Sequence, residues 1–221
     1  MPVTKPARDW WYRRTTWSAE DEQDFLVRLK RARQKAQYLV LQASALVDTG
    51  DAGLVGAGLR LVDRMLAEYP DPFFLSNAFL TRAEALVRLN RPEEAVFAFR
   101  GALEARRAMP NLVNYAYLEF AWTVARLDMQ SFFDEALAVL REFQQAGDLA
   151  FPTNAYRYFG ALALMLAARG ERTEARSRAK EALDAISQPR GPFGRHPTFG
   201  VVNAARIEAK THQRLWALAA V

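Results

Sequence analysis

This 221-residue chain has few of the residues that usually carry catalysis: two histidines, a few runs of adjacent carboxylates and no cysteine. Without cysteine there are no disulfides, thiolate metal sites or cysteine nucleophiles. His196 and His212 are 16 residues apart and form no His-Glu-x-x-His pattern, so a zinc site is not expected. We expect His212 on the surface of an amphipathic helix, and His196 in a loop rich in proline and glycine.

The carboxylate pairs Glu93/Glu94 and Asp134/Glu135 have the residue type needed for acid–base catalysis. Each pair also falls in the first turn of a predicted helix, where the helix dipole favours negative charge without any catalysis. No Gly-x-Gly-x-x-Gly or Walker-type loop is present to hold phosphates. We therefore predict a protein that is not an enzyme and that has no cofactor and no metal.

A basic helix face could bind an anion. Arg28, Arg31 and Lys35 recur at i, i+3 and i+7, shortly after the aromatic cluster of residues 10–17. One interpretation is a nucleic-acid surface, with phosphates on the basic side chains and bases stacked on tryptophans. The other is a solvated helix face with an aromatic hook packed on the first helices.

The charge is unevenly distributed along the chain. Residues 1–40 carry 9 basic and 5 acidic side chains, residues 41–168 carry 11 and 15, and residues 169–221 carry 10 and 5. Basic ends around a mildly acidic middle could attract an anionic partner. Because no signal peptide or apolar run long enough to span a bilayer is present, we expect a soluble, cytoplasmic protein.

The elements that must position these residues are all helical. Spacings of three and four residues between apolar positions predict helices, and no stretch alternates as a strand would. Ser18 is the expected N-cap of the first helix, with a possible break near residues 33–35. The predicted helices cover about 54–69, 74–89, 92–109, 112–127, 132–145, 155–168, 173–186 and 201–219.

One sequence pattern recurs through these helices. Gly58, Ala95, Ala136 and Ala175 each open the apolar face of a helix, at spacings of 37, 41 and 39 residues. In the clearest copy, Phe99 follows four residues after Ala95 and Ala102 three residues after that. The repetition predicts a stack of helix pairs, in which neighbouring pairs bury what a single pair leaves exposed.

The motif resembles the second helix of a tetratricopeptide repeat across about residues 37–187. Its first-helix signature is poorly kept, and the spacings exceed the 34-residue period of that family. The resemblance implies antiparallel helix pairs in a right-handed superhelix. The implied organisation is an aromatic and basic segment (1–17), the repeat region (18–187), a Pro/Gly-rich loop (188–200) and a capping helix (201–221), together one domain.

In such proteins the first helix of each pair lines a concave groove that binds extended peptides or helices. Tyr115, Glu119, Trp122 and Arg126 share one face of the predicted helix 112–127. We define the groove residues by this register as Asn77, Glu84, Arg88, Tyr115, Glu119, Trp122, Arg126 and Arg157. Alternatively, Tyr115 and Trp122 are core residues between repeats. The leading hypothesis is a protein-binding adaptor, the alternative a nucleic-acid-associated protein, and a homodimer is also compatible with the sequence.

Overall fold

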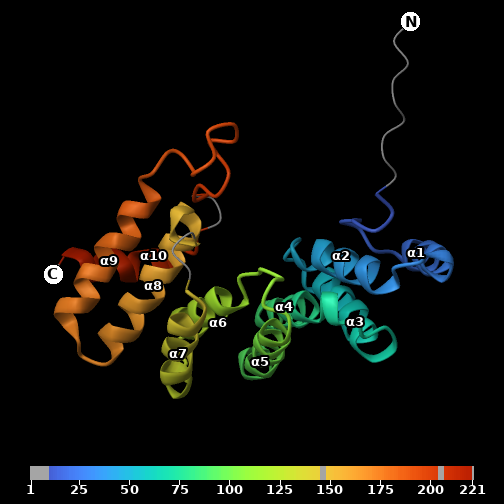
Figure 1. Cartoon of the computed structure of the whole chain (residues 1–221), viewed down its shortest axis with the longest axis horizontal. Coiled ribbons are helices and arrows are strands. Elements are labelled where there is room, and N and C mark those ends of the chain that lie inside the picture. The colour runs from blue at the N-terminus through green and yellow to red at the C-terminus, as the bar shows by residue number, and fades with distance from the viewer. Residues whose placement is uncertain (1–9, 145–147, 204–206, 221) are drawn as a thin grey trace, which may run out of the picture. The chain divides into compact units, whose positions relative to one another are not determined.

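The computed structural model describes residues 10–144, 148–203 and 207–220. All regular secondary structure in these ranges is helical, which confirms the all-α expectation (Figure 1). Residues 1–9 of the expected N-terminal segment lie outside the described ranges. The α-helices are α1 (Ala19–Arg31), α2 (Lys35–Val47), α3 (Ala52–Glu68), α4 (Pro72–Arg88), α5 (Pro92–Ala108), α6 (Ala116–Arg126), α7 (Phe133–Phe143), α8 (Pro152–Ala168), α9 (Arg172–Ile186) and α10 (Ala209–Ala220). Two short 3-10 helices, η1 (Gln130–Phe132) and η2 (Asp148–Ala150), lie between them.

The chain forms two compact units, the first ending at Ala116 and the second beginning at Tyr117. Within the first unit, α2 packs on α3, α3 on α4 and α4 on α5. Within the second, α8 packs on α9, and α10 packs on both. The rings of Tyr117 on α6 and Phe143 on α7 stack with centroids 6.2 Å apart. Consecutive helices therefore pack on one another in each unit, as in a helical repeat.

The small residues that marked the repeat are contact points between helices. Ala95, Ala136 and Ala175 have no exposed surface, and Phe99 is 1% exposed. At Gly58 the backbones of α3 and α2 approach closely, because a Cβ there would lie 2.8 Å from the carbonyl oxygen of Ala43 on α2. The recurring small residues are thus buried where helices pack.

A second periodic feature lies in the turns between paired helices. A residue with positive φ follows α2, α4, α6 and α8, at Gly50, Asn90, Asp128 and Gly170, with spacings of 40, 38 and 42 residues. The last three close Schellman motifs. At Asn90, for example, the next amide donates to Leu86 O at 2.8 Å, and the Asn90 amide donates to Val87 O at 3.0 Å.

Two helix boundaries at the N-terminal end follow the sequence expectations. Ser18 caps α1 through a capping box, in which the Asp21 amide donates to Ser18 Oγ at 3.1 Å and the Ser18 amide donates to Asp21 Oδ2 at 2.9 Å. The chain breaks between Arg31 and Lys35, so residues 18–48 form two helices.

The predicted start of the helix 112–127 was wrong. Helix α6 begins at Ala116, because polar contacts hold the preceding turn. Arg106, which is 3% exposed, donates to the carbonyl oxygen of Asn114, and Asn114 Nδ2 donates to Ser76 Oγ at 2.7 Å. Asn114 Oδ1 in turn accepts from the Ala116 amide.

The last helix also begins later than predicted, at Ala209 rather than near residue 201. Residues 201–203 are not helical, and residues 204–206 lie outside the described ranges. The chain entering this stretch is tied to α8, since the Thr153 amide donates to Gly200 O at 2.9 Å. The loop is thereby held against the start of α8 instead of continuing as helix.

Candidate functional site

In the second unit, four of the groove residues lie close to one another or to the same neighbouring helices. Glu119 on α6 forms an ion pair with Arg157 on α8. Arg126, at the end of α6, accepts a hydrogen bond at its carbonyl oxygen from Arg214 on α10, at 3.0 Å, and its side chain lies 3.4 Å from Glu208. The face of α6 that carries these residues is therefore shared with α8 and α10.

Trp122 lies between those two charged positions and has a packing role. Its ring is half-buried and lies 5.5 Å from the ring of Tyr156 on α8, at an interplanar angle of 56°. A Cβ added at Gly160 would come within 2.9 Å of the Trp122 ring, so the glycine makes room for the indole. One side of Trp122 is thus occupied by α8.

Tyr115 does not belong to this face. It precedes α6 and lies in the non-helical stretch held by Asn114, so the expected alignment with Glu119 at helical spacing is wrong. Its side chain is half-buried.

In the first unit, the groove residues Asn77, Glu84 and Arg88 lie on α4. Asn77 and Arg88 are exposed, and Glu84 is half-buried. Asn77 Oδ1 accepts a hydrogen bond from Asn114 Nδ2 at 3.1 Å, which links it to the buried Ser76–Asn114 network. These side chains form a polar surface on α4 that has one acidic and one basic group.

The aromatic cluster of residues 10–17 packs on α1 and α2, as the hook interpretation predicts. The Trp11 ring lies 4.9 Å from Tyr38 and 5.3 Å from Phe25, and Trp17 lies 5.5 Å from Phe25. Phe25 has no exposed surface. Trp10 differs from the others, since it is 46% exposed, with the guanidinium of Arg13 5.4 Å above its ring.

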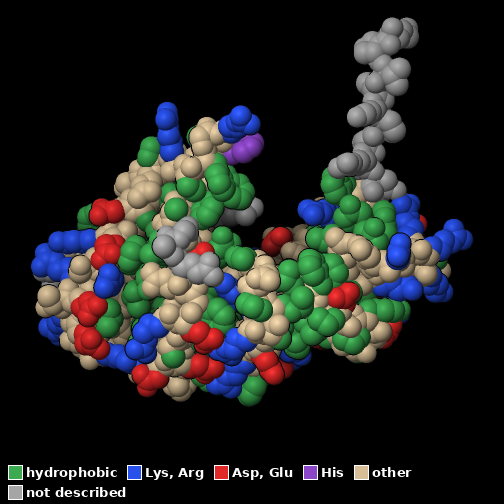
Figure 2. Space-filling model, in the orientation of Figure 1, with side chains coloured by type: hydrophobic (Ala, Val, Ile, Leu, Met, Phe, Trp, Pro, Cys, Tyr) green, Lys and Arg blue, Asp and Glu red, His purple; other side chains and the backbone are tan. Residues whose placement is uncertain are grey.

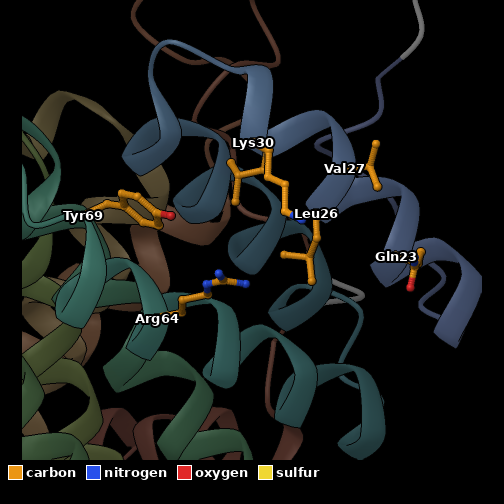
Figure 3. Close-up of a pocket in the computed structure, with 7 residues that line it drawn as sticks. Gln23, Leu26, Val27, Lys30, Arg64 and Tyr69 are labelled. Carbon is orange, nitrogen blue, oxygen red and sulfur yellow. The ribbon is translucent and has the colours of Figure 1, made fainter.

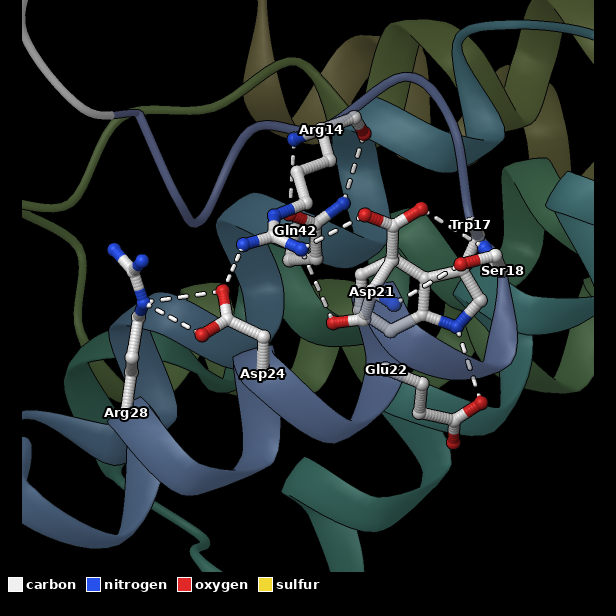
Figure 4. A network of polar contacts seen from close by, with 8 residues as sticks. All are labelled: Arg14, Trp17, Ser18, Asp21, Glu22, Asp24, Arg28 and Gln42. Atoms are coloured by element: carbon white, nitrogen blue, oxygen red, sulfur yellow. Dashed lines mark hydrogen bonds and ion pairs between the residues drawn. The ribbon is translucent and has the colours of Figure 1, made fainter.

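Arg14 fixes the aromatic hook through polar contacts (Figure 4). Its guanidinium lies between Asp21, at 2.9 Å, and Asp24, and Asp24 also accepts from Arg28 Nε at 3.1 Å. The hydrogen bond from Arg14 lowers the pKa of Asp24, and the backbone amide of Ser18 lowers the pKa of Asp21. Both carboxylates are therefore held in the charged form.

The predicted basic face is only partly available to a partner. Arg28 is engaged by Asp24, whereas Arg31 is exposed. The ammonium of Lys35 lies 5.7 Å from the centre of the Tyr69 ring. Basic side chains nonetheless gather over α1, as Figure 2 shows.

A pocket lies where the C-terminal half of α1 faces α3, and we call it the α1–α3 pocket (Figure 3). Its volume is about 170 Å³. Its lining residues are Gln23, Leu26, Val27, Leu29, Lys30, Arg64 and Tyr69. None of these lining residues was among the site residues predicted from the sequence. Residues from two helices meet here, and periodicity along one helix cannot reveal such a pairing.

The two histidines are placed very differently. His196 is exposed in the loop. His212 is not the surface residue we expected: it is half-buried, its ring lies 6.4 Å from that of Tyr156, and its Nδ1 is buried without a hydrogen-bond partner among the described residues.

Burial raises the pKa of Tyr156 to about 12. Tyr156 thus stays neutral at physiological pH.

The carboxylate pairs at helix starts form ion pairs with nearby arginines. Glu94 accepts two hydrogen bonds of 2.6 Å from Arg91, which lower the pKa of the carboxyl. Asp134 lies 2.5 Å from Arg169. Across the described ranges, no three His, Asp or Glu side chains cluster closely enough to bind a metal ion.

None of the described helices combines the length and hydropathy needed to cross a bilayer. No known protein family, curated protein or solved structure matches this chain. Function is therefore inferred from the geometry of the chain itself.

Proposed function

We propose that this protein is a non-enzymatic adaptor, built as a tetratricopeptide-like superhelix, which binds a peptide or protein segment along the first helices of its repeats. In the first unit the candidate surface for that segment is the face of α4 with Asn77, Glu84 and Arg88. In the second unit it is the face of α6 and α8 with Glu119, Trp122, Arg126 and Arg157. Tyr115 is left out because it precedes α6.

The observation that supports this proposal is that consecutive helices pack on one another and that the second helices bury the recurring small residues. The second helices α3, α5, α7 and α9 place Gly58, Ala95, Ala136 and Ala175 in contact with their neighbours. Solenoids of this kind use the surface that remains for extended binding faces. A first helix such as α4 leaves Asn77 and Arg88 exposed to a partner.

The groove residues favour a partner segment of mixed charge. Glu84 and Arg88 differ in sign on α4. In the second unit, Arg157 is paired with Glu119 and Arg126 lies beside Glu208, so both signs are present there as well. Complementary charges fix the register and orientation of a bound segment more than they raise affinity. We expect Trp122 to contribute through the part of its ring that α8 leaves uncovered.

The alternative is a nucleic-acid-associated protein. The exposed ring of Trp10 beside Arg13 favours it, because an exposed aromatic with a nearby cation can stack a base. The engagement of Trp11 and Trp17 in packing and of Arg28 with Asp24 weighs against it. We therefore rank it second.

Affinity capture from the native host, with and without nuclease, tests the proposal. We compare the wild type with Arg88→Glu on α4 and with the matched control Arg60→Glu, an exposed arginine on the second helix α3. The adaptor proposal predicts a protein partner that survives nuclease, is lost with Arg88→Glu and is retained with Arg60→Glu. Loss of every protein partner on nuclease treatment would instead support the nucleic-acid alternative.

A further inference from the structure

Two cationic side chains from different helices converge in the α1–α3 pocket. Lys30 on α1 and Arg64 on α3 both extend into it, and the hydroxyl of Tyr69 points toward them (Figure 3). The ring of Tyr69 also contacts Lys35, whose ammonium lies 5.7 Å from the ring centre. Like charges that face the same space repel each other, and an anion between them removes that repulsion.

Within the described residues, Glu68 is the carboxylate that contacts one of these two cations, Arg64. Arg64 Nε bonds to Glu68 at 3.0 Å along α3, a contact that leaves the terminal nitrogens of the guanidinium for other acceptors. No carboxylate of the described residues forms an ion pair with Lys30. The acidic half of α1 is different, because Asp24 is already bonded to Arg14 and Arg28. No acidic residue of the described ranges lines the pocket, so the charge of its lining is positive.

The rest of the pocket wall is apolar. Leu26 and Val27 line it from α1, and Val27 is 44% exposed, so its side chain is accessible to a bound group. A volume of about 170 Å³ is many times the roughly 10–15 Å³ that one water needs. The pocket therefore has room for one charged group and one neighbouring side chain.

We propose that the α1–α3 pocket binds an acidic side chain of a partner protein together with an adjacent apolar side chain. Lys30, Arg64 and the Tyr69 hydroxyl bind the carboxylate, and Leu26 and Val27 contact the apolar neighbour. This contact goes beyond the adaptor proposal, since it uses α1 and α3 and none of the groove residues.

The surroundings favour a peptide over a nucleic acid as the source of the anion. A shallow hollow lined by Glu20, Gln23 and Asp24 continues from the pocket along α1. Asp24 is already paired with Arg14 and Arg28, but the carboxylate of Glu20 repels a chain of phosphates that extends along α1. A single acidic side chain bound at Lys30 and Arg64 does not reach that position. Leu26 and Val27 also have no counterpart in a phosphodiester backbone.

The experiment is an NMR titration of the full-length protein with two capped tetrapeptides, acetyl-Gly-Leu-Glu-Gly-amide and its Gln analogue. The capped ends ensure that only the side chain differs in charge. We expect saturable shifts of the amides of Lys30, Arg64 and Tyr69 with the Glu peptide, and affinity weaker by about tenfold or more with the Gln peptide. Inorganic phosphate and oligo-uridine serve as the competing probes.

Variants of Lys30 and Arg64 test whether the Glu peptide binds at the pocket. Lys30→Gln and Arg64→Gln should each weaken binding of the Glu peptide by about tenfold, since each removes one charged hydrogen-bond donor. Arg31→Gln is the matched control, because Arg31 is an exposed cation on the same helix that does not line the pocket. It should leave the affinity within about twofold, because exposed charges are screened.

Several results would overturn the proposal. Equal binding of the Glu and Gln peptides would show that no anion is recognised. Absence of saturable shifts at the pocket, or equal weakening by Arg31→Gln, would show that the pocket is not the site. Tighter binding of phosphate or oligo-uridine than of the Glu peptide would assign the pocket to another class of ligand.

Discussion

The side-chain amide of Gln42 pairs with the backbone of Arg14 through two hydrogen bonds: the Arg14 amide donates to Gln42 Oε1 at 2.9 Å, and Gln42 Nε2 donates to Arg14 O at 2.8 Å. Gln42 lies on α2 and has no exposed surface. A buried side chain thus replaces the partner strand or helix that the backbone of the aromatic hook lacks. The hook is therefore an ordered part of the first unit.

Replacement of Gln42 by leucine should destabilise the first unit by about 1–3 kcal/mol, because the backbone N–H and C=O of Arg14 lose their partners. Urea unfolding followed by tryptophan fluorescence measures the change. Gln37→Leu, at a half-buried glutamine of the same helix, is the control and should change stability by no more than about 0.5 kcal/mol. Equal effects would mean that the pairing with Arg14 does not stabilise the hook.

Two glycines on α3 should respond to alanine in opposite ways. At Gly58 a Cβ would lie 2.8 Å from the backbone oxygen of Ala43 and 2.9 Å from Val47 Cγ2, so Gly58→Ala should destabilise by about 1–3 kcal/mol. At Gly56 the nearest atom is Arg60 Nη1 at 4.0 Å, so Gly56→Ala should stabilise by about 0.5–1 kcal/mol. Thermal unfolding of the pair measures both signs, and stabilisation by Gly58→Ala would refute the close contact between α2 and α3.

The recurring positive-φ turns predict another pair of opposite effects. Asp128 has φ of 55° and Gly170 has φ of 81° at equivalent positions after α6 and α8. Asp128→Gly should stabilise the second unit by up to about 1 kcal/mol, and Gly170→Ala should destabilise it by a similar amount, because side chains are strained in this conformation. Chemical denaturation tests both, and the same sign for the two changes would contradict the equivalence of the turns.

The contacts of Arg14 with Asp24 predict an acid-sensitive contribution to stability. The pKa of Asp24 is lowered in the folded protein, chiefly by the hydrogen bond from Arg14. A lowered pKa means that the stabilisation is fully present above the ordinary value of about 3.9 and is lost as the pH falls through the folded value. The difference in unfolding free energy between wild type and Asp24→Asn should therefore be constant near neutral pH and shrink below about pH 4.

The same titration in an Arg14→Gln background is the control for that prediction. Without the guanidinium, Asp24→Asn should show a smaller dependence on pH. An unchanged dependence would mean that Arg14 is not the main cause of the lowered pKa.

The sequence predicted most of the helices because amphipathic spacing depends on each helix alone. Ser18 as a cap and the small residues at Ala95 and Ala175 follow from local chemistry in the same way. The start of α6 could not be predicted, because the buried side chain of Arg106 and the network around Asn114 hold the preceding turn. Of these contacts, the one between Asn114 and Ser76 joins residues 38 positions apart in the chain.

The candidate sites show the same limit. Spacing along one helix predicts that Glu119, Trp122 and Arg126 share a face. It cannot predict that Tyr156 packs on Trp122 or that Glu208 lies beside Arg126. We expected His212 on the surface because its burial depends on a contact with α8, which the pattern of its own helix does not show. The α1–α3 pocket was missed for a related reason, since Lys30 and Arg64 meet only once α1 and α3 pack.

Site-specific photo-crosslinking tests the central claim, that the first helices of the pairs bind a protein. A photoreactive amino acid is placed at Asn77 or Arg88 on α4 and, for comparison, at the exposed positions Arg100 or Glu104 on α5. The adaptor account predicts that both α4 positions crosslink to the same protein partner in native-host extract treated with nuclease, and that the α5 positions do not. Crosslinks from α5 alone, or of equal strength from both helices, would contradict it.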